Sequence, residues 1–285
     1  MTRSVAVLSP GPLCTVQDEG RPGLAETGVG RSGACDRQAY RLANRLVGNP
    51  AGAAVLEVTF GGLVLLAEHD VVVVTTGARC AGARVHNSPA LLRNGEQLAL
   101  GVPTAGLRTY VALRGGIDLP PVLGSRSTDL LAGLGPAQLA AGDVLSLGVP
   151  TRPMPGVDLA PVADPEVGDV QVAVTEGPRW GWFTEAAHAA LLGRAYTMTS
   201  ESNRIGLRLE GVPLQRAGAG ELPTEGITRG ALQVPSSGQP VLFLADHPVT
   251  GGYPVVAYCD DDDVDRCGQL QPGQRLSFTR SRRRP

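Results

Sequence analysis

Most of the chain alternates short apolar runs with turn-forming residues, a pattern typical of β-strands joined by tight turns. Apolar runs bounded by Gly, Pro, Asn or Asp predict strands at about 4–8, 54–60, 62–67, 70–76 and 169–175. The tight spacing of the three strands between residues 54 and 76 favours antiparallel pairing. The sequence therefore predicts a mainly β protein with a few short helices.

The clearest helical periodicity follows residue 36. An apolar stripe at helical spacing is formed there by Ala39, Leu42, Ala43, Leu46 and Val47. Asp36 is placed to cap the N-terminus of this helix, and residues 48–50, Gly-Asn-Pro, end it. Shorter helices are expected near 184–192 and 263–269. Acidic residues precede the second, where the helix dipole favours negative charge.

A turn that leads into an alternating strand occurs three times, at 94–101, 141–148 and 272–278. This repetition indicates duplicated β units. Residues 149–168 contain five prolines and show little periodicity, so we expect a linker there. The prediction is two domains, at 1–155 and 168–285.

Polar side chains concentrate in residues 221–254. The apolar run at 240–245 predicts a buried strand, and turn signals lie on both sides of it. Glycines near strand ends let a ligand approach the backbone, because no Cβ stands in the way. The candidate binding groups of this stretch are Glu225, Gln233, Asp246, Thr250 and Tyr253.

Composition narrows the possible chemistry. The chain has 285 residues, 42% of them hydrophobic, and a formal net charge of −2, which gives no indication of nucleic-acid binding. All 25 basic residues are arginine. The absence of lysine excludes a Schiff base, a phosphate loop of the Walker type and covalent attachment of biotin to this chain.

Cysteine and histidine usage points away from disulfides and metals. The five cysteines are scattered without a CxxC pair, so a reducing cytoplasm is the expected location. The four histidines are far apart, and we predict no metal site. Because no run of about 18 apolar residues occurs, we expect no membrane segment.

The glycine-rich segment before the first helix matches GxGxxG at 28–33. A dinucleotide site is not favoured, because no alternation of strands and helices follows. Backbone amides at 30–34, together with Arg31, could instead bind an anion, or the segment could simply be a turn that needs glycine. Cys35 lacks an assigned base and is a weak candidate nucleophile.

Two further clusters place polar groups in turns near strands. The first holds Arg114 and Ser127, and the second holds Asn203 and Arg204. With residues 221–254 they supply amides, arginines and carboxylates but no strong nucleophile. This mixture suits polarising an amide or carboxylate, or holding a partner's cofactor, better than covalent catalysis.

Nine stretches of the chain together resemble one family, known as the C subunit of 5-oxoprolinase, KipA, allophanate hydrolase subunit 2, or the carboxyltransferase A/B subdomain of urea carboxylase. They are TVQDEGRPG, GVGRSGACD, RLANRLVGNP, LEVTFGG, LRGGID, GSRSTDLL, SNRIGLRLEG, TEGITRGALQVP and ADHPVTGGYP. The resemblance implies two cyclophilin-like β-barrel domains. It also implies an obligate partner, the KipI-like B subunit, which would share an active-site cleft with this chain.

The resemblance implies three alternative functions. The first is the C subunit of an ATP-dependent 5-oxoprolinase, completed by the A and B subunits, which opens 5-oxo-L-proline to L-glutamate with ATP, and with Mg²⁺ bound by the complex. The second is a carboxyltransferase subunit that uses biotin carried by another chain. The third is a KipA-like regulatory module that binds KipI and relieves its inhibition of a sensor kinase.

Residue roles follow from the same resemblance. Asn203 corresponds to a substrate-binding asparagine, and Gln233 would help it bind an amide or lactam. Glu225 or Asp246 would orient the substrate or move a proton. The expected anion-binding and pocket-lining residues are Arg31, Arg114, Arg204, Ser127, Thr250 and Tyr253. The family usually has methionine where this chain has Cys35, which argues against a catalytic cysteine.

Overall fold

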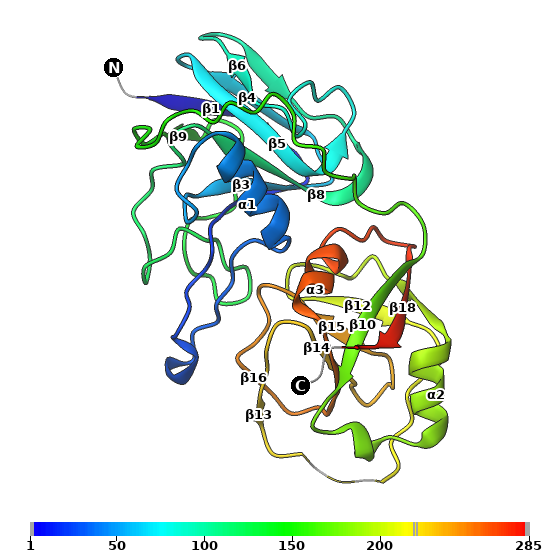
Figure 1. Ribbon diagram of the computed structural model, residues 1–285. Coiled ribbons are helices and arrows are strands. Elements are labelled where there is room, and N and C mark those ends of the chain that lie inside the picture. The colour runs from blue at the N-terminus through cyan, green and yellow to red at the C-terminus, as the bar shows by residue number, and fades with distance from the viewer. Residues whose placement is uncertain (1–2, 219, 221, 283–285) are drawn as a thin grey trace. The chain divides into compact units, whose positions relative to one another are not determined.

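The computed structural model describes residues 3–218, 220 and 222–282 (Figure 1). Strands predominate, and the described residues contain three α-helices, as expected for a mainly β chain. The chain forms two compact units. The first runs through Pro22 and includes Ser32–Asp129 and Gly133–Pro165. The second comprises Gly23–Arg31, Leu130–Ala132 and the chain from Glu166 onward, so two short segments within the predicted N-terminal domain belong to it.

The strands of the first unit form two antiparallel sheets. One has the order β7-β4-β1-β9 and the other the order β2-β3-β8-β5-β6. Their bounds are β1 Ser4–Pro10, β2 Leu13–Gln17, β3 Val55–Thr59, β4 Leu63–Ala67, β5 Val71–Cys80, β6 Ala90–Leu92, β7 Gln97–Ala99, β8 Pro103–Leu113 and β9 Val144–Ser146.

Alternation along the strands gives the five-stranded sheet two buried faces. Leu56 and Val58 of β3 pack with strands of the four-stranded sheet in one core. Val55 of β3 points the other way, into a core with Tyr40 and Ala43 of α1, Arg37–Leu46. Period-two alternation therefore produces both the contact between the sheets and the helix-covered face.

Helix α1 has the predicted cap. The Asp36 side chain accepts a hydrogen bond from the Ala39 N–H at 2.9 Å, and the helix ends at Leu46, just before Gly48. The Cys35 N–H, at the same N-terminus, donates to Oε2 of Glu57 at 2.9 Å. A carboxylate of the protein itself is therefore bound at this helix end.

The predicted strands of residues 54–76 do form antiparallel pairs, but not with one another. β3 pairs with β2 and β8, whereas β4 pairs with β1 and β7. The connection at Phe60, Gly61 and Gly62 has φ of 63°, 70° and 77° and carries the chain from one sheet to the other. A Cβ on Gly61 would lie 2.1 Å from the Gly101 carbonyl oxygen, so this crossing requires glycine.

The three repeated turns share one hydrogen-bonding pattern. In each, the last of four residues donates its N–H to the carbonyl of the first, and its side chain accepts from the N–H of that first residue. The pairs are Arg93 with Glu96, Ala140 with Asp143, and Gln271 with Gln274. The repetition seen in the sequence thus corresponds to one local structure used before β7, β9 and β18.

The second unit is built around a closed seven-stranded barrel of order β10-β17-β14-β15-β12-β11-β18. All neighbours pair antiparallel except β10 and β18, which close the barrel in parallel. The bounds are β10 Val170–Glu176, β11 Ala195–Met198, β12 Gly206–Glu210, β14 Ala231–Gln233, β15 Val241–Phe243, β17 Val255–Cys259 and β18 Arg275–Arg280.

Short elements complete this unit. Helix α2, Glu185–Gly193, is capped by Thr184, and α3, Asp261–Cys267, is the acidic helix predicted from the sequence. A two-stranded ribbon pairs β13, Glu225–Gly226, with β16, Thr250–Gly251. The remaining elements are the 3-10 helices η1, Ala25–Thr27, and η2, Trp180–Trp182.

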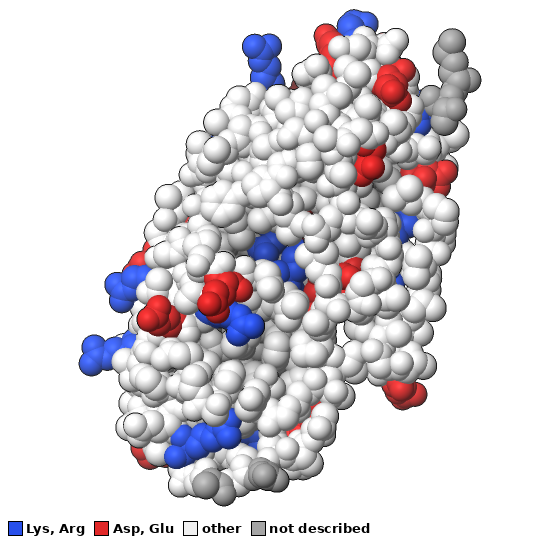
Figure 2. Space-filling model, turned by 180° about the vertical axis from the view of Figure 1, so that it is seen from behind, with Lys and Arg blue, Asp and Glu red and all other residues white. Residues whose placement is uncertain are grey.

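On the face seen in Figure 2, arginine and acidic side chains of the described residues stand in small groups separated by uncharged atoms. No helix among the described residues is long and apolar enough to cross a membrane.

Candidate functional site

Most of the predicted site residues lie in the second unit, in two neighbouring groups. Asn203, Arg204 and Asp246 form one, since the Asp246 N–H donates to the Arg204 carbonyl at 3.0 Å. The other surrounds the β13–β16 ribbon and includes Glu225, Thr250, Gln233 and Tyr253. The Ile227 N–H donates to Val249 O at 2.8 Å, which ties the end of this ribbon to the loop after Asp246.

The Arg204 and Asp246 side chains form a buried bidentate pair. Nε of Arg204 lies 2.9 Å from Oδ2 of Asp246, and Nη2 lies 2.9 Å from Oδ1. The exposed fractions of these side chains are 1% and 0%. The Leu130 N–H adds a hydrogen bond to Oδ2 at 3.1 Å. Paired and fully buried, this carboxylate holds the local structure rather than acting as a mobile base.

Asn203 sits on the turn that this pair anchors and is itself exposed. Its Oδ1 accepts a hydrogen bond from the Ile205 N–H at 2.8 Å, which fixes the orientation of the side-chain amide. Asn203 is exposed and Nδ2 has no hydrogen-bond acceptor among the described residues, so its two hydrogens remain available as donors. This is the arrangement needed to bind a carbonyl oxygen.

Glu225 in the ribbon pairs with Arg179, a residue that the sequence did not single out. The two side chains are 26% and 28% exposed. The hydrogen bond from Arg179 lowers the pKa of the Glu225 carboxyl, so Glu225 is an anion near neutrality and an acceptor rather than a proton donor. The Arg179 guanidinium also lies 5.0 Å from the centre of the Trp182 ring. The GPRWGWF segment places Arg179 next to two tryptophans, a signal that could have identified it.

Gln233 and Tyr253 are in contact. Nε2 of Gln233 donates to the Tyr253 carbonyl at 3.0 Å, and Gln233 is buried while the Tyr253 side chain is exposed. The Arg216 guanidinium lies 6.0 Å from the centre of the Tyr253 ring and donates to the Val234 carbonyl at 2.9 Å. Arg216 was also missed, because no motif surrounds it in the sequence.

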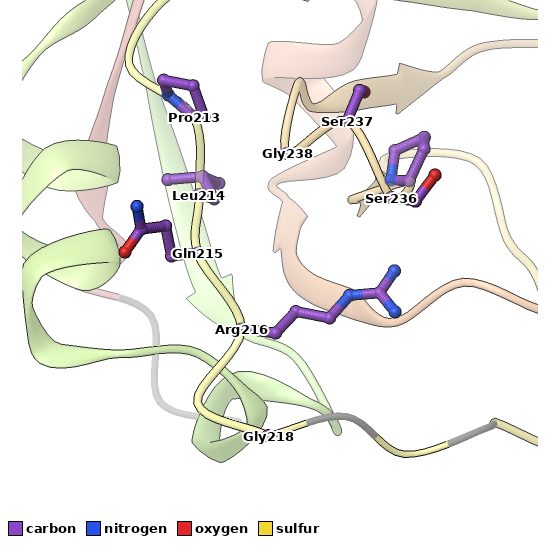
Figure 3. A pocket seen from close by; sticks show the side chains of 9 residues that line it. Pro213, Leu214, Gln215, Arg216, Gly218, Ser236, Ser237 and Gly238 are labelled. Atoms are coloured by element: carbon purple, nitrogen blue, oxygen red, sulfur yellow. The ribbon is translucent and has the colours of Figure 1, made fainter.

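An open pocket of about 500 Å³ lies beside Arg216 (Figure 3). Its walls are the segment from Pro213 to Gly218 and the loop from Pro235 to Gly238. In Figure 3 the Arg216 side chain extends toward the side of Ser236, whereas Gln215 points the opposite way. Neither Asn203 nor Asp246 lines this pocket.

Two predicted residues belong to the first unit, where they hold loops. The Ser127 hydroxyl donates to Oδ1 of Asp18 at 2.6 Å, and Ser125 makes an equivalent bond. Arg114 donates to the carbonyls of Val47 and Arg152, at 2.7 Å each. Their proposed part in substrate binding stays a prediction. Arg31 lies in Gly23–Arg31, the segment grouped with the second unit.

The glycine segment before α1 uses some of its amides internally. The Ala34 N–H donates to Asp18 O at 3.1 Å, which leaves this amide unavailable to an external anion. Cys35 has no exposed surface, and all five cysteines are free thiols within buried residues. The described residues contain no group of three His, Cys, Asp or Glu side chains that could hold a metal ion.

Comparison with known proteins places this geometry in a family. The chain belongs to the carboxyltransferase domain family, subdomain A and B, which matches residues 27–280. It is 36% identical to the 5-oxoprolinase C subunit of Escherichia coli (strain K12), over 95% of this chain and 89% of that protein. It is 32% identical to the urea amidolyase of Lachancea kluyveri, over 95% of this chain but only 16% of that protein.

Solved structures show the same fold within longer chains. The crystal structure of TTHA0988 superposes with a TM-score of 0.86 at 35% identity, covering 98% of this chain and 55% of that one. The Kluyveromyces lactis urea amidolyase superposes with a TM-score of 0.88 at 30% identity, covering 98% and 19%. This chain thus spans about half of the first structure and about a fifth of the second.

Proposed function

We propose that this chain is the C subunit of a heteromeric ATP-dependent 5-oxoprolinase, which converts 5-oxo-L-proline, ATP and water to L-glutamate, ADP and phosphate. One observation carries the proposal. The match to the protein named as the C subunit of 5-oxoprolinase covers 95% of this chain and 89% of that protein. The extent of this match supports the proposal that the two chains have the same role. The A subunit and the KipI-like B subunit would complete the enzyme.

ATP is expected because the substrate is a lactam. Resonance between nitrogen and carbonyl makes this bond a poor target for water. Phosphorylation of the lactam oxygen would remove that resonance and make attack at the carbonyl carbon feasible. The described residues supply no cluster of metal ligands. We therefore assign Mg²⁺ and ATP to the assembled complex and derive no step through the metal on this chain.

The part we assign to this chain is to bind and orient the lactam. The Asn203 amide, whose oxygen is engaged by the Ile205 N–H, would donate from Nδ2 to the substrate carbonyl. The Arg204–Asp246 pair would act as a positioning device that keeps this turn rigid. Glu225, kept ionised by Arg179, would accept a hydrogen bond from the substrate.

The test is glutamate release by the three co-expressed subunits, measured with and without ATP. We expect release only with ATP and only when all three subunits are present. Asn203→Ala should lower turnover about tenfold or more, since a donor to the reacting oxygen is lost. Asn94→Ala is the matched control, because Asn94 is another exposed turn asparagine, in the first unit.

Glutamate release by this chain alone, or full turnover by the Asn203→Ala complex, would contradict the proposal. An assembled complex without 5-oxoprolinase activity would leave the KipA-like module and the carboxyltransferase subunit as the alternatives.

A second candidate is a biotin-dependent carboxyltransferase subunit. The family description and the TM-score of 0.88 to the K. lactis urea amidolyase support it. Since the sequence contains no lysine, biotin would have to arrive on another chain. Biocytin binding to the complex with the KipI-like partner, measured by calorimetry, is the expected result. Absence of biocytin binding would remove this candidate.

A further inference from the structure

Hydrogen bonds join the two segments that form the pocket beside Arg216 and fix their positions. The Leu214 N–H donates to the Gly238 carbonyl at 2.9 Å, and Nη2 of Arg216 donates to Val234 O at 2.9 Å. Gly238 has φ +76°, and a Cβ on it would lie 2.9 Å from Cβ of Pro213. Glycine thus permits this close approach, and the pocket is preformed rather than dependent on a ligand.

The charged side chain that lines this pocket, Arg216, is positive and has no carboxylate partner among the described residues. Within the described part of the chain, no carboxylate lies within 4.0 Å of the Arg216 guanidinium, whose contacts are one carbonyl and the face of Tyr253. This distinguishes Arg216 from Arg204 and Arg179, each of which has a carboxylate partner. A half-buried arginine without an acidic partner retains strong donors for an anion.

Serine hydroxyls stand on the opposite wall. Ser236 and Ser237 line the pocket, and the Ser237 oxygen accepts only a long hydrogen bond, 3.3 Å, from the Gln239 N–H. Both hydroxyls can donate toward a bound group. Pro213 and Pro235 supply the apolar surface beside them.

We propose that this pocket binds a small molecule through an oxyanion, a carboxylate or a phosphate, held by Arg216 and the Ser236 hydroxyl. The volume of about 500 Å³ is within the range of about 300–1,000 Å³ usual for small-molecule sites. It exceeds what a single phosphate needs, so the rest of the pocket holds the body of the ligand. The inference does not depend on the proposed 5-oxoprolinase activity, since it concerns binding by this chain alone.

Tryptophan fluorescence of the purified full chain reports on the site. Both tryptophans are in η2, and the Trp182 carbonyl accepts a hydrogen bond from the Ala217 N–H at 2.8 Å, next to Arg216. The probes are 5-oxo-L-proline, the neutral lactam 2-pyrrolidinone, inorganic phosphate and ATP. We expect saturable binding of at least one anionic probe and none of 2-pyrrolidinone. The carboxylate and phosphate probes then distinguish the two sources of the oxyanion.

Arg216→Ala should weaken binding of that anion about tenfold or more, because a charge-assisted donor is removed. Arg275→Ala is the matched control, since Arg275 is an exposed arginine on β18, outside the pocket. Ser236→Phe fills the pocket from an exposed loop without adding a tryptophan, and it tests the same site if Arg216→Ala fails to fold. Equal binding by wild type and both pocket variants, or no anion binding by the wild type, would overturn the proposal.

The two proposals fail separately. If the three-subunit complex releases no glutamate but this chain still binds the anion, only the proposed 5-oxoprolinase function is contradicted.

Discussion

Two arginine–carboxylate pairs in the second unit have the same chemistry and opposite surroundings. The Arg204 and Asp246 side chains are 1% and 0% exposed, whereas the Arg179 and Glu225 side chains are 28% and 26% exposed. The first pair also accepts a backbone hydrogen bond from Leu130, and the second faces Trp182. The difference shows that an arginine in a sequence motif is not necessarily a ligand-binding group. Whether its guanidinium is buried against a carboxylate or partly exposed decides whether it can contact a ligand.

Because water is excluded from both charges of the Arg204–Asp246 pair, neither side chain is stable there without the other. Each charge there depends on its partner, because no solvent is present to replace the lost interaction. The partly exposed Arg179–Glu225 pair can replace its mutual contacts with water at a lower cost in free energy. A ligand carboxylate or amide could therefore compete for Arg179, whereas Arg204 is committed to Asp246. We infer that the Arg204–Asp246 pair holds the turn that carries Asn203. The Arg179–Glu225 pair is the one that could rearrange when a ligand binds.

Breaking the buried pair should have the largest effect. Asp246→Ala leaves the Arg204 charge buried without its carboxylate, and we expect a loss of about 3–5 kcal/mol in the free energy of unfolding. Urea denaturation followed by circular dichroism measures it. The double variant Arg204→Met, Asp246→Leu is the control, because it removes both charges and should recover most of the loss. An Asp246→Ala protein as stable as wild type would show that the pair is not the anchor of the turn.

Breaking the open pair should have a smaller effect on stability and a clear local signature. Arg179→Ala removes the guanidinium beside Trp182, so the tryptophan emission should change while the urea midpoint moves far less than in Asp246→Ala. Trp182→Phe, which keeps the Arg179–Glu225 pair, identifies the emitting ring. A loss of stability equal to that of Asp246→Ala would end the distinction between the two pairs.

The smallest expected effect is the pH response of the open pair. Arg179 lowers the pKa of Glu225 below its ordinary value of 4.5. The stabilisation is therefore present above pH 4.5 and is lost as the pH falls through the lowered pKa. Trp182 emission between pH 7 and pH 3 follows this step, and Glu225→Gln should abolish it. A step at or above the ordinary pKa in the wild type would contradict the assignment.

Local chemistry made parts of this fold predictable. The helix after Asp36 follows from its apolar stripe and cap, and the turns at Gly95, Gly142 and Gly273 follow from glycine at positive φ. Strand partners were less accessible. β3 and β4 are neighbours in sequence but belong to different sheets, because the backbone at Phe60, Gly61 and Gly62 redirects the chain. A pattern of apolar positions does not encode that change of sheet.

The sequence singled out several residues of the candidate site but not all of the side chains that they contact. Gln233 and Tyr253 come from one glycine-rich stretch and are in contact. The partner of Glu225, by contrast, is 46 residues away. Arg114 lies in a glycine-rich turn that the sequence singled out and Arg216 does not, yet Arg114 bonds to two loop carbonyls and Arg216 faces a pocket. Only tertiary structure separates arginines that hold loops from arginines that remain open to an anion.

The parallel closure of β10 on β18 has a consequence for assembly. Every strand of the seven-stranded barrel already has a neighbour on each side, so this barrel offers no edge to which a foreign strand could be added. The sheets of the first unit differ, because β7, β9, β2 and β6 are terminal strands. A second polypeptide that joins by strand addition would extend one of those sheets or the β13–β16 ribbon, whereas recognition of the barrel itself must be made by side chains and loops.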